Sequence, residues 1–175
     1  MFGITTPLQF YGKLVQEFDD FCDDPGSARH AMNFVITAHH MSDWVWKGFL
    51  KEDEAKQKQL GMKKSIHGLR EWLDGQSIWQ AQMQGLANGS KHFQPEGTWV
   101  RHITSTFGGA AYSEVPHGGS RTILYVDMGE LEGRLHMVPA THIFEAVMRF
   151  WRDFMREHSP YGLALPLGKT QLSEP

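Results

Sequence analysis

A stripe of polar and aromatic side chains runs along segment 28–47, whose apolar residues recur with helical periodicity. Spacings of four, three and four residues place its members on one face of a helix: Asn33, Thr37, His40 and Trp44. Asp43 follows His40 by three residues and can contact it on the same side. A carboxylate beside an imidazole fixes the tautomer of the ring and raises its basicity, which suits a general base, a metal ligand or a buried structural pair. The stripe therefore faces either an internal groove or the solvent.

A second polar group lies near the end of the helix predicted over 78–92. Asn88 and His92 are one turn apart on the same face, and Lys91 is three residues from Asn88. An amide, an ammonium and an imidazole together suit the binding of a phosphate or a carboxylate. The alternative is helix capping, in which Lys91 and His92 bond the last carbonyl groups of the helix.

Several common catalytic and ligand-binding motifs are absent. The chain contains no H-E-x-x-H, G-x-x-x-x-G-K-[ST], G-x-G-x-x-G or G-x-S-x-G sequence. Its single cysteine, Cys22, excludes an internal disulfide and a zinc site with several cysteines, and it fits a reducing compartment. His39, His40 and Asp43 lack a partner histidine at ligand spacing, so we expect no resident metal and no cofactor.

The charge balance excludes binding to nucleic acid through a strongly basic surface. Seventeen Lys and Arg stand against 20 Asp and Glu in 175 residues, for a formal net charge of −3. Segment 51–70 has a local excess of bases, which either meets a phosphate backbone or is a solvated helix face. The N-terminus lacks the features of a signal peptide, and no apolar stretch approaches the length of about 20 residues that a membrane helix needs. We expect a cytoplasmic protein without a membrane partner.

These groups are positioned by a chain that changes from helical to strand periodicity near Gly97. Helices are predicted over 7–20, 28–47, 51–73 and 78–92, strands over 98–106, 121–128 and 133–138, and a last amphipathic helix over 140–158. Short connections between the first four helices are typical of an antiparallel bundle. The predicted fold class is mainly α (α+β), with a four-helix bundle-like core and a small antiparallel β meander inserted before the C-terminal helix.

The domain organisation follows from the same elements. One globular domain is predicted over residues 1–158, and it comprises a helical bundle (1–93), the β meander (97–138) and the C-terminal helix (140–158). Residues 159–175 contain Pro160, Pro166 and two glycines, and they are predicted to form an irregular, mobile tail.

The spacing Asn88-x-x-x-His92 resembles a motif of the HEPN superfamily (higher eukaryotes and prokaryotes nucleotide-binding). These are small helical-bundle domains, many of them metal-independent ribonucleases, toxins or nucleotide-binding proteins, and two copies of the motif often meet across a dimer. The resemblance implies that Asn88 orients the site and that His92 transfers protons at the ribose hydroxyl or the leaving oxygen. The arginine of the family motif falls at Ala87, so Lys91 would neutralise the phosphate as a point charge.

Two longer segments resemble a group of uncharacterised bacterial proteins of similar length. They are Asn33-Phe34-x-x-Thr37-Ala38-x-His40-x-x-Asp43-Trp44 and Ala87-Asn88-Gly89-x-Lys91-His92-Phe93. This resemblance supplies no activity, but it suggests that the polar residues of both segments form one cluster.

The leading hypothesis is an HEPN-like protein that binds RNA or a nucleotide in a groove between the helices predicted over 28–47 and 78–92. In its catalytic form the protein would be a metal-independent endoribonuclease. The expected catalytic residues are His92, Lys91, His40 and Asp43, and the expected substrate-binding residues are Asn88, Asn33, Thr37 and Trp44.

Two alternatives belong to other classes of protein. In the first, the same side chains form a buried hydrogen-bond network in a non-catalytic interaction protein, such as an antitoxin or an immunity protein with a protein partner. In the second, a metal-dependent hydrolase uses His39, His40, Asp43 and His92. A homodimer is expected from the family resemblance and because six Trp and 11 Phe exceed the needs of a small core.

Overall fold

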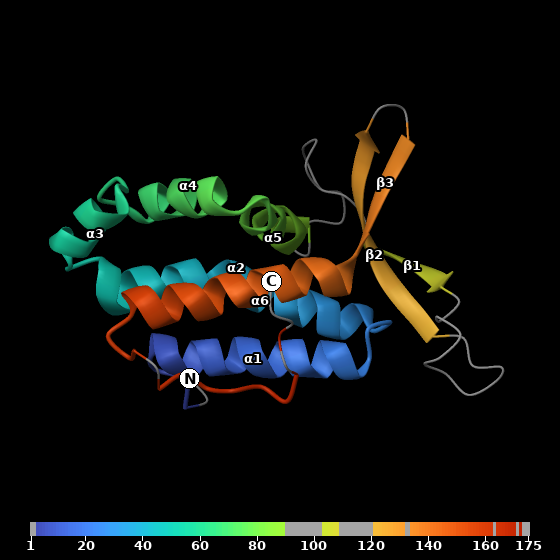
Figure 1. Cartoon of the computed structure of the whole chain (residues 1–175), viewed down its shortest axis with the longest axis horizontal. Coiled ribbons are helices and arrows are strands. Elements are labelled where there is room, and N and C mark those ends of the chain that lie inside the picture. The colour runs from blue at the N-terminus through green and yellow to red at the C-terminus, as the bar shows by residue number, and fades with distance from the viewer. Residues whose placement is uncertain are drawn as a thin grey trace.

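The computed structural model describes residues 3–89, 103–108, 121–131, 134–162, 164–170 and 172. Their elements in chain order are α1 (Pro7–Asp23), α2 (Ala28–Val45), the π-helical turn η1 (Trp46–Leu50), α3 (Glu54–Leu60), α4 (Ile66–Gln76), α5 (Ile78–Gly89), β1 (Ile103–Gly108), β2 (Arg121–Leu131), β3 (Arg134–Pro139) and α6 (Ala140–His158) (Figure 1). The strands form one antiparallel sheet in the order β1-β2-β3. The predicted fold class, mainly α with a small antiparallel meander before the last helix, is confirmed.

The start of α1 is determined by local sequence. The Thr6 side chain accepts a hydrogen bond from the Gln9 backbone, and the Gln9 side chain bonds the Thr6 backbone in return, which makes a capping box. Pro7 occupies the first helical position, where its missing N–H would have no partner within the helix. These residues fix where α1 begins, and the Pro7 ring lies against Gly48 just beyond the end of α2.

Helix α2 is central in the bundle and packs against α1, α4, α5 and α6. Its apolar side chains are buried around much of its circumference: Ala31, Phe34, Val35, Ala38, Met41 and Val45. It runs antiparallel to α1, because Phe10 contacts Trp44 near one end of the pair and Phe18 contacts Phe34 near the other. The broad apolar surface of this helix explains its central position.

The single helix predicted over 51–73 is wrong, because this segment forms the two helices α3 and α4. Gly61, which follows α3, has a φ of +68°, a left-handed conformation that ends helices and that glycine adopts without steric cost. Ser65 then begins α4, because its side chain accepts a hydrogen bond from the Gly68 backbone at 2.9 Å. The helical periodicity on both sides of Gly61 concealed this break.

The sheet lies at the end of the bundle where α6 begins (Figure 1). Leu124 and Val126 of β2 are buried, and the Leu124 N–H donates to the Pro25 carbonyl at 3.2 Å, which ties the sheet to the turn between α1 and α2. The register of β2 against β3 shifts between Asp127 and Glu130, as at a β-bulge. Of the strand predicted over 98–106, residues 98–102 lie outside the described residues.

Helix α6 is part of the bundle core rather than an appendage to it. The Phe144 ring contacts Phe21 of α1 and Phe34 of α2, with ring centroids 4.7 Å and 4.4 Å apart. Trp151 and Phe154, two turns further along, are also buried. The core therefore joins the first two helices of the chain to the last one.

After α6 the chain turns back along α1 (Figure 1). Residues 164–170 and 172, which we call the strap, form no helix or strand. The buried Asp19 side chain accepts hydrogen bonds from the backbone N–H groups of Lys169 and Thr170, each at 2.8 Å. The predicted tail thus has irregular backbone in its described part, and a carboxylate of α1 holds it in place.

Candidate functional site

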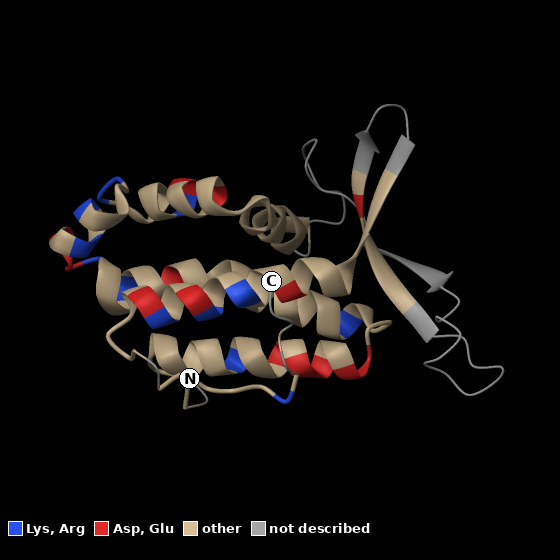
Figure 2. Ribbon diagram, viewed as in Figure 1, with Lys and Arg blue, Asp and Glu red and all other residues tan. Residues whose placement is uncertain are grey.

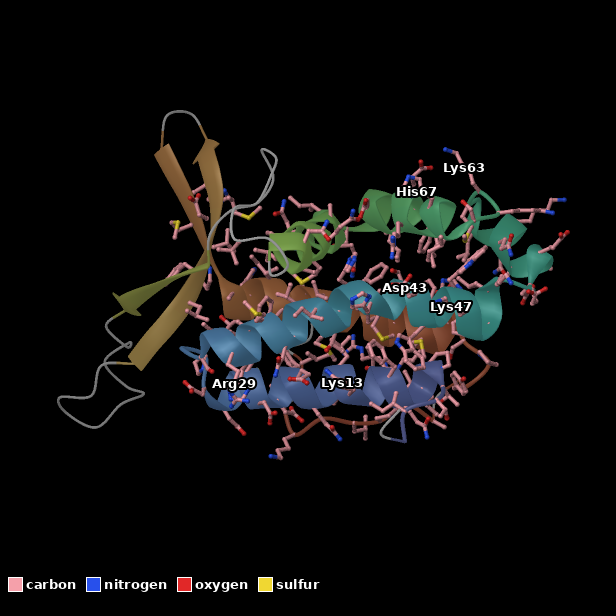
Figure 3. The ribbon with its side chains drawn as sticks, turned by 180° about the vertical axis from the view of Figure 1, so that it is seen from behind. Lys13, Arg29, Asp43, Lys47, Lys63 and His67 are labelled. Carbon is pink, nitrogen blue, oxygen red and sulfur yellow. The ribbon has the colours of Figure 1, made fainter. Side chains whose placement is uncertain are left out.

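Four of the predicted site residues line one groove between α1 and α2. They are Thr37, His40, Asp43 and Trp44, and the groove has a volume of about 800 Å³. The other lining residues are Thr5, Pro7, Phe10, Lys13, Ile36, Lys47 and Gly48. Figure 3 shows Lys13 on α1, with Asp43 on α2 and Lys47 just beyond its end. We call this the α1/α2 groove.

An aromatic pair forms one wall of the α1/α2 groove. The rings of Phe10 and Trp44 stack with centroids 4.7 Å apart and an angle of 13° between their planes. Phe10 is buried in this contact, so the half-buried Trp44 ring is the member of the pair that can offer π surface to a nucleic-acid base.

The end of the groove is shaped by a π-helical turn. The Lys51 N–H donates to the Trp46 carbonyl at 2.8 Å, so α2 continues into η1 with a wider hydrogen-bond spacing. Gly48 in this turn approaches the Pro7 ring so closely that any side chain at position 48 would overlap it. Single π turns occur frequently at functional sites, and this one carries Lys47 at the edge of the groove.

The predicted contact between His40 and Asp43 is present. His40 Nδ1 lies 3.1 Å from Asp43 Oδ2, and Arg70 Nη2 of α4 donates to Asp43 Oδ1 at 3.0 Å. Arg70 Nε also donates to Ser42 Oγ at 3.4 Å. Because the Asp43 carboxylate orients Nδ1, the ring atom available to a ligand is Nε2. The His40 side chain is 39% exposed, so solvent or a ligand can reach it.

Lysines supply positive charge to the groove. Lys13 Nζ donates to Glu17 Oε1 at 2.7 Å and to Thr37 Oγ1 at 2.6 Å. Thr37 is 2% exposed, so its hydroxyl positions Lys13, although we expected it to bind substrate directly. Lys47 is exposed, and none of the ion pairs between described residues includes it.

The structure separates the remaining predicted site residues from this groove or does not describe them. Asn33 is half-buried on α2 and Asn88 is exposed on α5, and neither lines the groove. Within the described part of the chain, α5 contributes no lining residue. Lys91 and His92 lie outside the described residues, so the expected proximity of His40 and His92 stays a prediction.

The position of the motif arginine is buried. Ala87 is 1% exposed and belongs to the core, whereas its neighbour Asn88 is exposed. An arginine at position 87 would point into the bundle rather than toward a ligand. Among the described residues, the lysines that line the α1/α2 groove are Lys13 and Lys47.

Sequence reasoning missed Phe10, Lys13, Lys47 and Arg70. Arg70 reaches Asp43 across 27 positions of sequence, and this pairing has no local signature. Phe10 and Lys13 are three residues apart on α1, so helical spacing could have placed them on one face, but it does not say which helix that face meets.

Charges on the described residues are mixed over the molecule. Figure 2 shows acidic residues gathered on the C-terminal half of α1, and basic and acidic residues interspersed on α6. No three His, Cys, Asp or Glu side chains of the described residues are grouped so that they could hold a metal ion. None of the described helices combines the length and the apolar character needed to cross a membrane.

Comparisons with family models, with curated proteins and with solved structures found no match for this chain.

Proposed function

We propose that the protein binds single-stranded RNA, with a nucleotide as the smallest ligand, in the α1/α2 groove. The observation that carries this proposal is the convergence of the Trp44 and Phe10 rings, Lys13 and Lys47, and the His40–Asp43 pair on one groove. Aromatic rings stack with bases, and lysines attract phosphates without reading sequence. Lys13 is already paired with Glu17, so the positive charge that the groove offers to a phosphate comes mainly from Lys47.

The proposal includes RNA cleavage by proton transfer. His40 Nε2 takes the proton from a ribose 2′-hydroxyl, and the resulting oxygen attacks the adjacent phosphorus. The bond from phosphorus to the 5′-oxygen breaks, and His92 supplies the proton that the leaving oxygen requires. The products are a 2′,3′-cyclic phosphate and a 5′-hydroxyl end. Asp43 orients His40 and stabilises its protonated form.

One observation favours the alternative of a non-catalytic interaction protein. Asp43 is bonded by His40 on its own helix and by Arg70 on α4, and Arg70 also bonds Ser42. These contacts join α2 to α4 whether or not a ligand is present. In that alternative the cluster specifies helix packing, and RNA binding is absent.

RNA binding is tested by the fluorescence anisotropy of a labelled 12-nucleotide RNA at several salt concentrations. Trp44→Leu should weaken binding by about tenfold or more, because stacking contributes about 1–3 kcal/mol per base. Trp79→Leu is the matched control, since Trp79 is half-buried on α5 and does not line the groove. Equal binding by the two variants would contradict the proposal.

Two lysine variants, one in the groove and one outside it, test the electrostatic part of the same proposal. Lys47→Gln should lower the slope of log K against log salt concentration by about one, as expected for one lost phosphate contact. Lys58→Gln removes an exposed lysine of α3 outside the groove and should leave the slope unchanged. The same slope in both variants would place the RNA elsewhere.

Cleavage is tested in the presence of a chelator by chromatographic detection of cyclic-phosphate ends. His40→Ala should retain RNA binding and lose cleavage, whereas cleavage that persists in repurified His40→Ala would remove His40 from the mechanism. If the parent protein binds no RNA and His40→Ala only lowers the melting temperature, the interaction-protein alternative holds.

The proposal also includes the cellular setting and the assembly. A single, half-buried cysteine suits a reducing compartment, so we place the RNA binding in the cytoplasm. We propose a homodimer from the family resemblance, and light scattering at several concentrations measures the mass in solution.

A further inference from the structure

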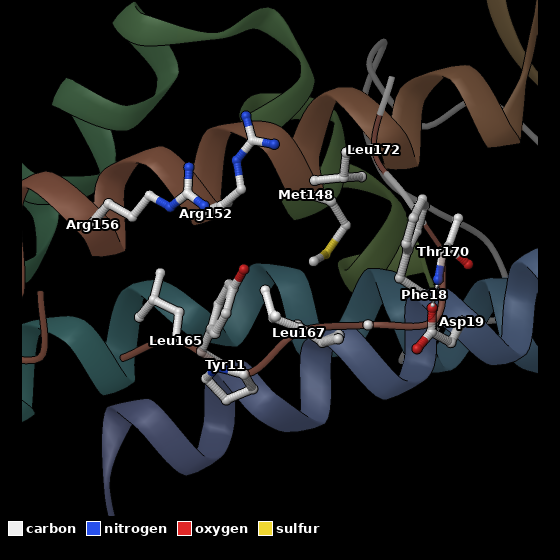
Figure 4. A pocket seen from close by; sticks show the side chains of 13 residues that line it. Tyr11, Phe18, Asp19, Met148, Arg152, Arg156, Leu165, Leu167, Thr170 and Leu172 are labelled. Carbon is white, nitrogen blue, oxygen red and sulfur yellow. Dashed lines mark hydrogen bonds between the residues drawn. The ribbon is translucent and has the colours of Figure 1, made fainter. Parts of the chain in front are cut away.

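A second cavity lies on the other side of α1, away from the α1/α2 groove. It has a volume of about 470 Å³ and is enclosed by α1, α6 and the strap. The strap covers the seam between the two helices, and the bonds from Lys169 and Thr170 to Asp19 hold it there. Figure 4 shows this cavity, which we call the strap pocket.

The α6 side of the strap pocket is cationic. Arg152 and Arg156 are four residues apart, so they lie on one face of α6, and both line the pocket. The Tyr11 hydroxyl on the α1 side points toward this cationic wall (Figure 4). Burial raises the pKa of Tyr11 to about 12, with Arg152 and Arg156 acting in the opposite direction, so the hydroxyl stays protonated and can donate a hydrogen bond.

Two acidic groups near the pocket, Asp19 and Asp153, offset part of this charge. Both oxygens of Asp19 accept backbone N–H bonds from the strap. Asp153 pairs with Arg152, with Nε at 2.8 Å and Nη2 at 3.3 Å from its two oxygens. None of the ion pairs among the described residues includes Arg156. The pocket therefore offers at least one cation that an anionic ligand can pair with.

Apart from Asp19 and Thr170, the remaining walls of the strap pocket are apolar. They comprise Val15 and Phe18 of α1, Met148 of α6, and Leu165 and Leu172 of the strap. These apolar side chains, which include the flexible Met148, suit a hydrocarbon chain, and a cavity of this size is within the usual range for small ligands. A ligand that fits this pocket should therefore have one negatively charged end and an apolar chain.

We propose that the strap pocket binds an amphiphilic oxyanion, meaning an aliphatic chain of medium length with a carboxylate or a phosphate at one end. The head group pairs with Arg156 and accepts a hydrogen bond from Tyr11, and the chain packs against Met148 and Phe18. This site is separate from the α1/α2 groove, and its occupancy requires neither RNA binding nor RNA cleavage.

The test is calorimetric titration of the full chain with octanoate, octyl phosphate and octanol. Saturable binding of octanoate or octyl phosphate, with octanol much weaker, is the expected result, and the tighter of the two anions identifies the head group. Equal binding of octanol, or no saturable binding of either anion, would overturn the proposal.

Arginine variants locate the head group within the pocket. Arg156→Gln should weaken binding of the preferred anion by about tenfold, as loss of a charged hydrogen bond predicts. Arg149→Gln is the matched control, because Arg149 lies on α6 and pairs with Glu145 outside the pocket. Equal affinities of these two variants would overturn the assignment of the head group to this wall.

A nuclear magnetic resonance measurement separates binding in the pocket from binding elsewhere. With methionine methyl groups labelled in the parent protein, the Met148 signal should shift on titration with the anion, and Met148→Leu assigns it. The Met32 signal should not shift, because Met32 is exposed on α2 and does not line the pocket. Saturation without a shift at Met148 would overturn the proposal.

Anion binding should be unchanged in Lys47→Gln, which distinguishes a failure of the strap-pocket proposal from a failure of RNA binding.

Discussion

The α1/α2 groove and the strap pocket share one helix but arrange their polar groups in different ways. Phe10 and Lys13 of α1 face the groove, whereas Tyr11, Val15 and Phe18 face the pocket. In the groove, polar side chains from different helices bond one another, as Lys13 does with Thr37 and Arg70 with Asp43. In the strap pocket, the arginines lie on α6, Asp19 of α1 bonds the strap backbone, and most of the other lining residues are apolar.

This difference separates two kinds of ligand chemistry. A network in which a carboxylate orients an imidazole is suited to moving protons beside a stacked base. A pocket that has a cation at one wall and apolar side chains around the rest is suited to holding an anion in a fixed orientation without reacting with it. Side chains one residue apart on α1 serve the two regions, because successive residues of a helix point about 100° apart.

The largest expected effect comes from a core residue on which both regions depend. Phe144 of α6 contacts Phe21 of α1 and Phe34 of α2 and is fully buried. Phe144→Ala should lower the free energy of unfolding by about 3–5 kcal/mol, through lost burial and the cavity that remains. Urea unfolding measures this change. A loss below about 1 kcal/mol would show that α6 is not part of a shared core.

The next effect should be confined to the strap pocket. Asp19→Ala removes the acceptor of two backbone hydrogen bonds and should cost about 1–3 kcal/mol. The strap should then become more accessible, which limited proteolysis and hydrogen exchange of residues 164–170 measure. RNA affinity of the α1/α2 groove should not change. Unaltered exchange in the strap would contradict the role given to Asp19.

A smaller effect is expected from breaking the ion pair between Asp43 of α2 and Arg70 of α4. The side chains of Asp43 and Arg70 are 29% and 30% exposed, so screening by water limits their interaction to about 1 kcal/mol or less. A double-mutant cycle with Asp43→Asn and Arg70→Gln measures the coupling in the free energy of unfolding. A coupling of zero would contradict the interaction-protein alternative and leave a positioning role for Asp43.

The smallest effect concerns pH and lies outside both regions. His158, at the end of α6, contacts Phe154 with ring centroids 5.0 Å apart, and burial lowers its pKa from the usual 6.5. The unfolded chain therefore binds a proton more readily than the folded one. The stability that His158 contributes is complete above about pH 6.5 and is lost as the pH falls through the lower, folded pKa.

Unfolding measured at several pH values tests this sign. His158→Gln should flatten the stability profile below pH 6.5, where the parent protein loses stability. A variant whose profile keeps the parent's slope in this range would show that other groups cause it. Both candidate sites should keep their affinities at pH 7.5 in this variant, because His158 lines neither.

Local sequence was sufficient for much of the fold. Helical periodicity predicted α1, α2 and α6 with ends within about three residues of those observed, because an amphipathic pattern reports local backbone geometry directly. The break at Gly61 was missed, because helical periodicity continues on both sides of it. The π turn after α2 was also missed, since the sequence has no local signal for it.

For the candidate site, the sequence by itself determined which residues share a face. Thr37, His40 and Trp44 lie on one stripe and Asp43 reaches His40, because helix geometry follows from spacing alone. Only the tertiary structure decided which element this stripe meets. It meets α1, which supplies Phe10 and Lys13, because the partner of a helix face depends on how the whole apolar surface is buried.

The strap pocket was decided entirely by tertiary structure. Tyr11 and Arg156 are separated by 145 positions (156 − 11) and become neighbours only because α1 and α6 pack together and the chain then returns along α1. Spacing along the sequence reports contacts within one element, where backbone geometry sets the distance. Contacts between distant elements arise from burial of the common core, and this is a property of the folded chain as a whole.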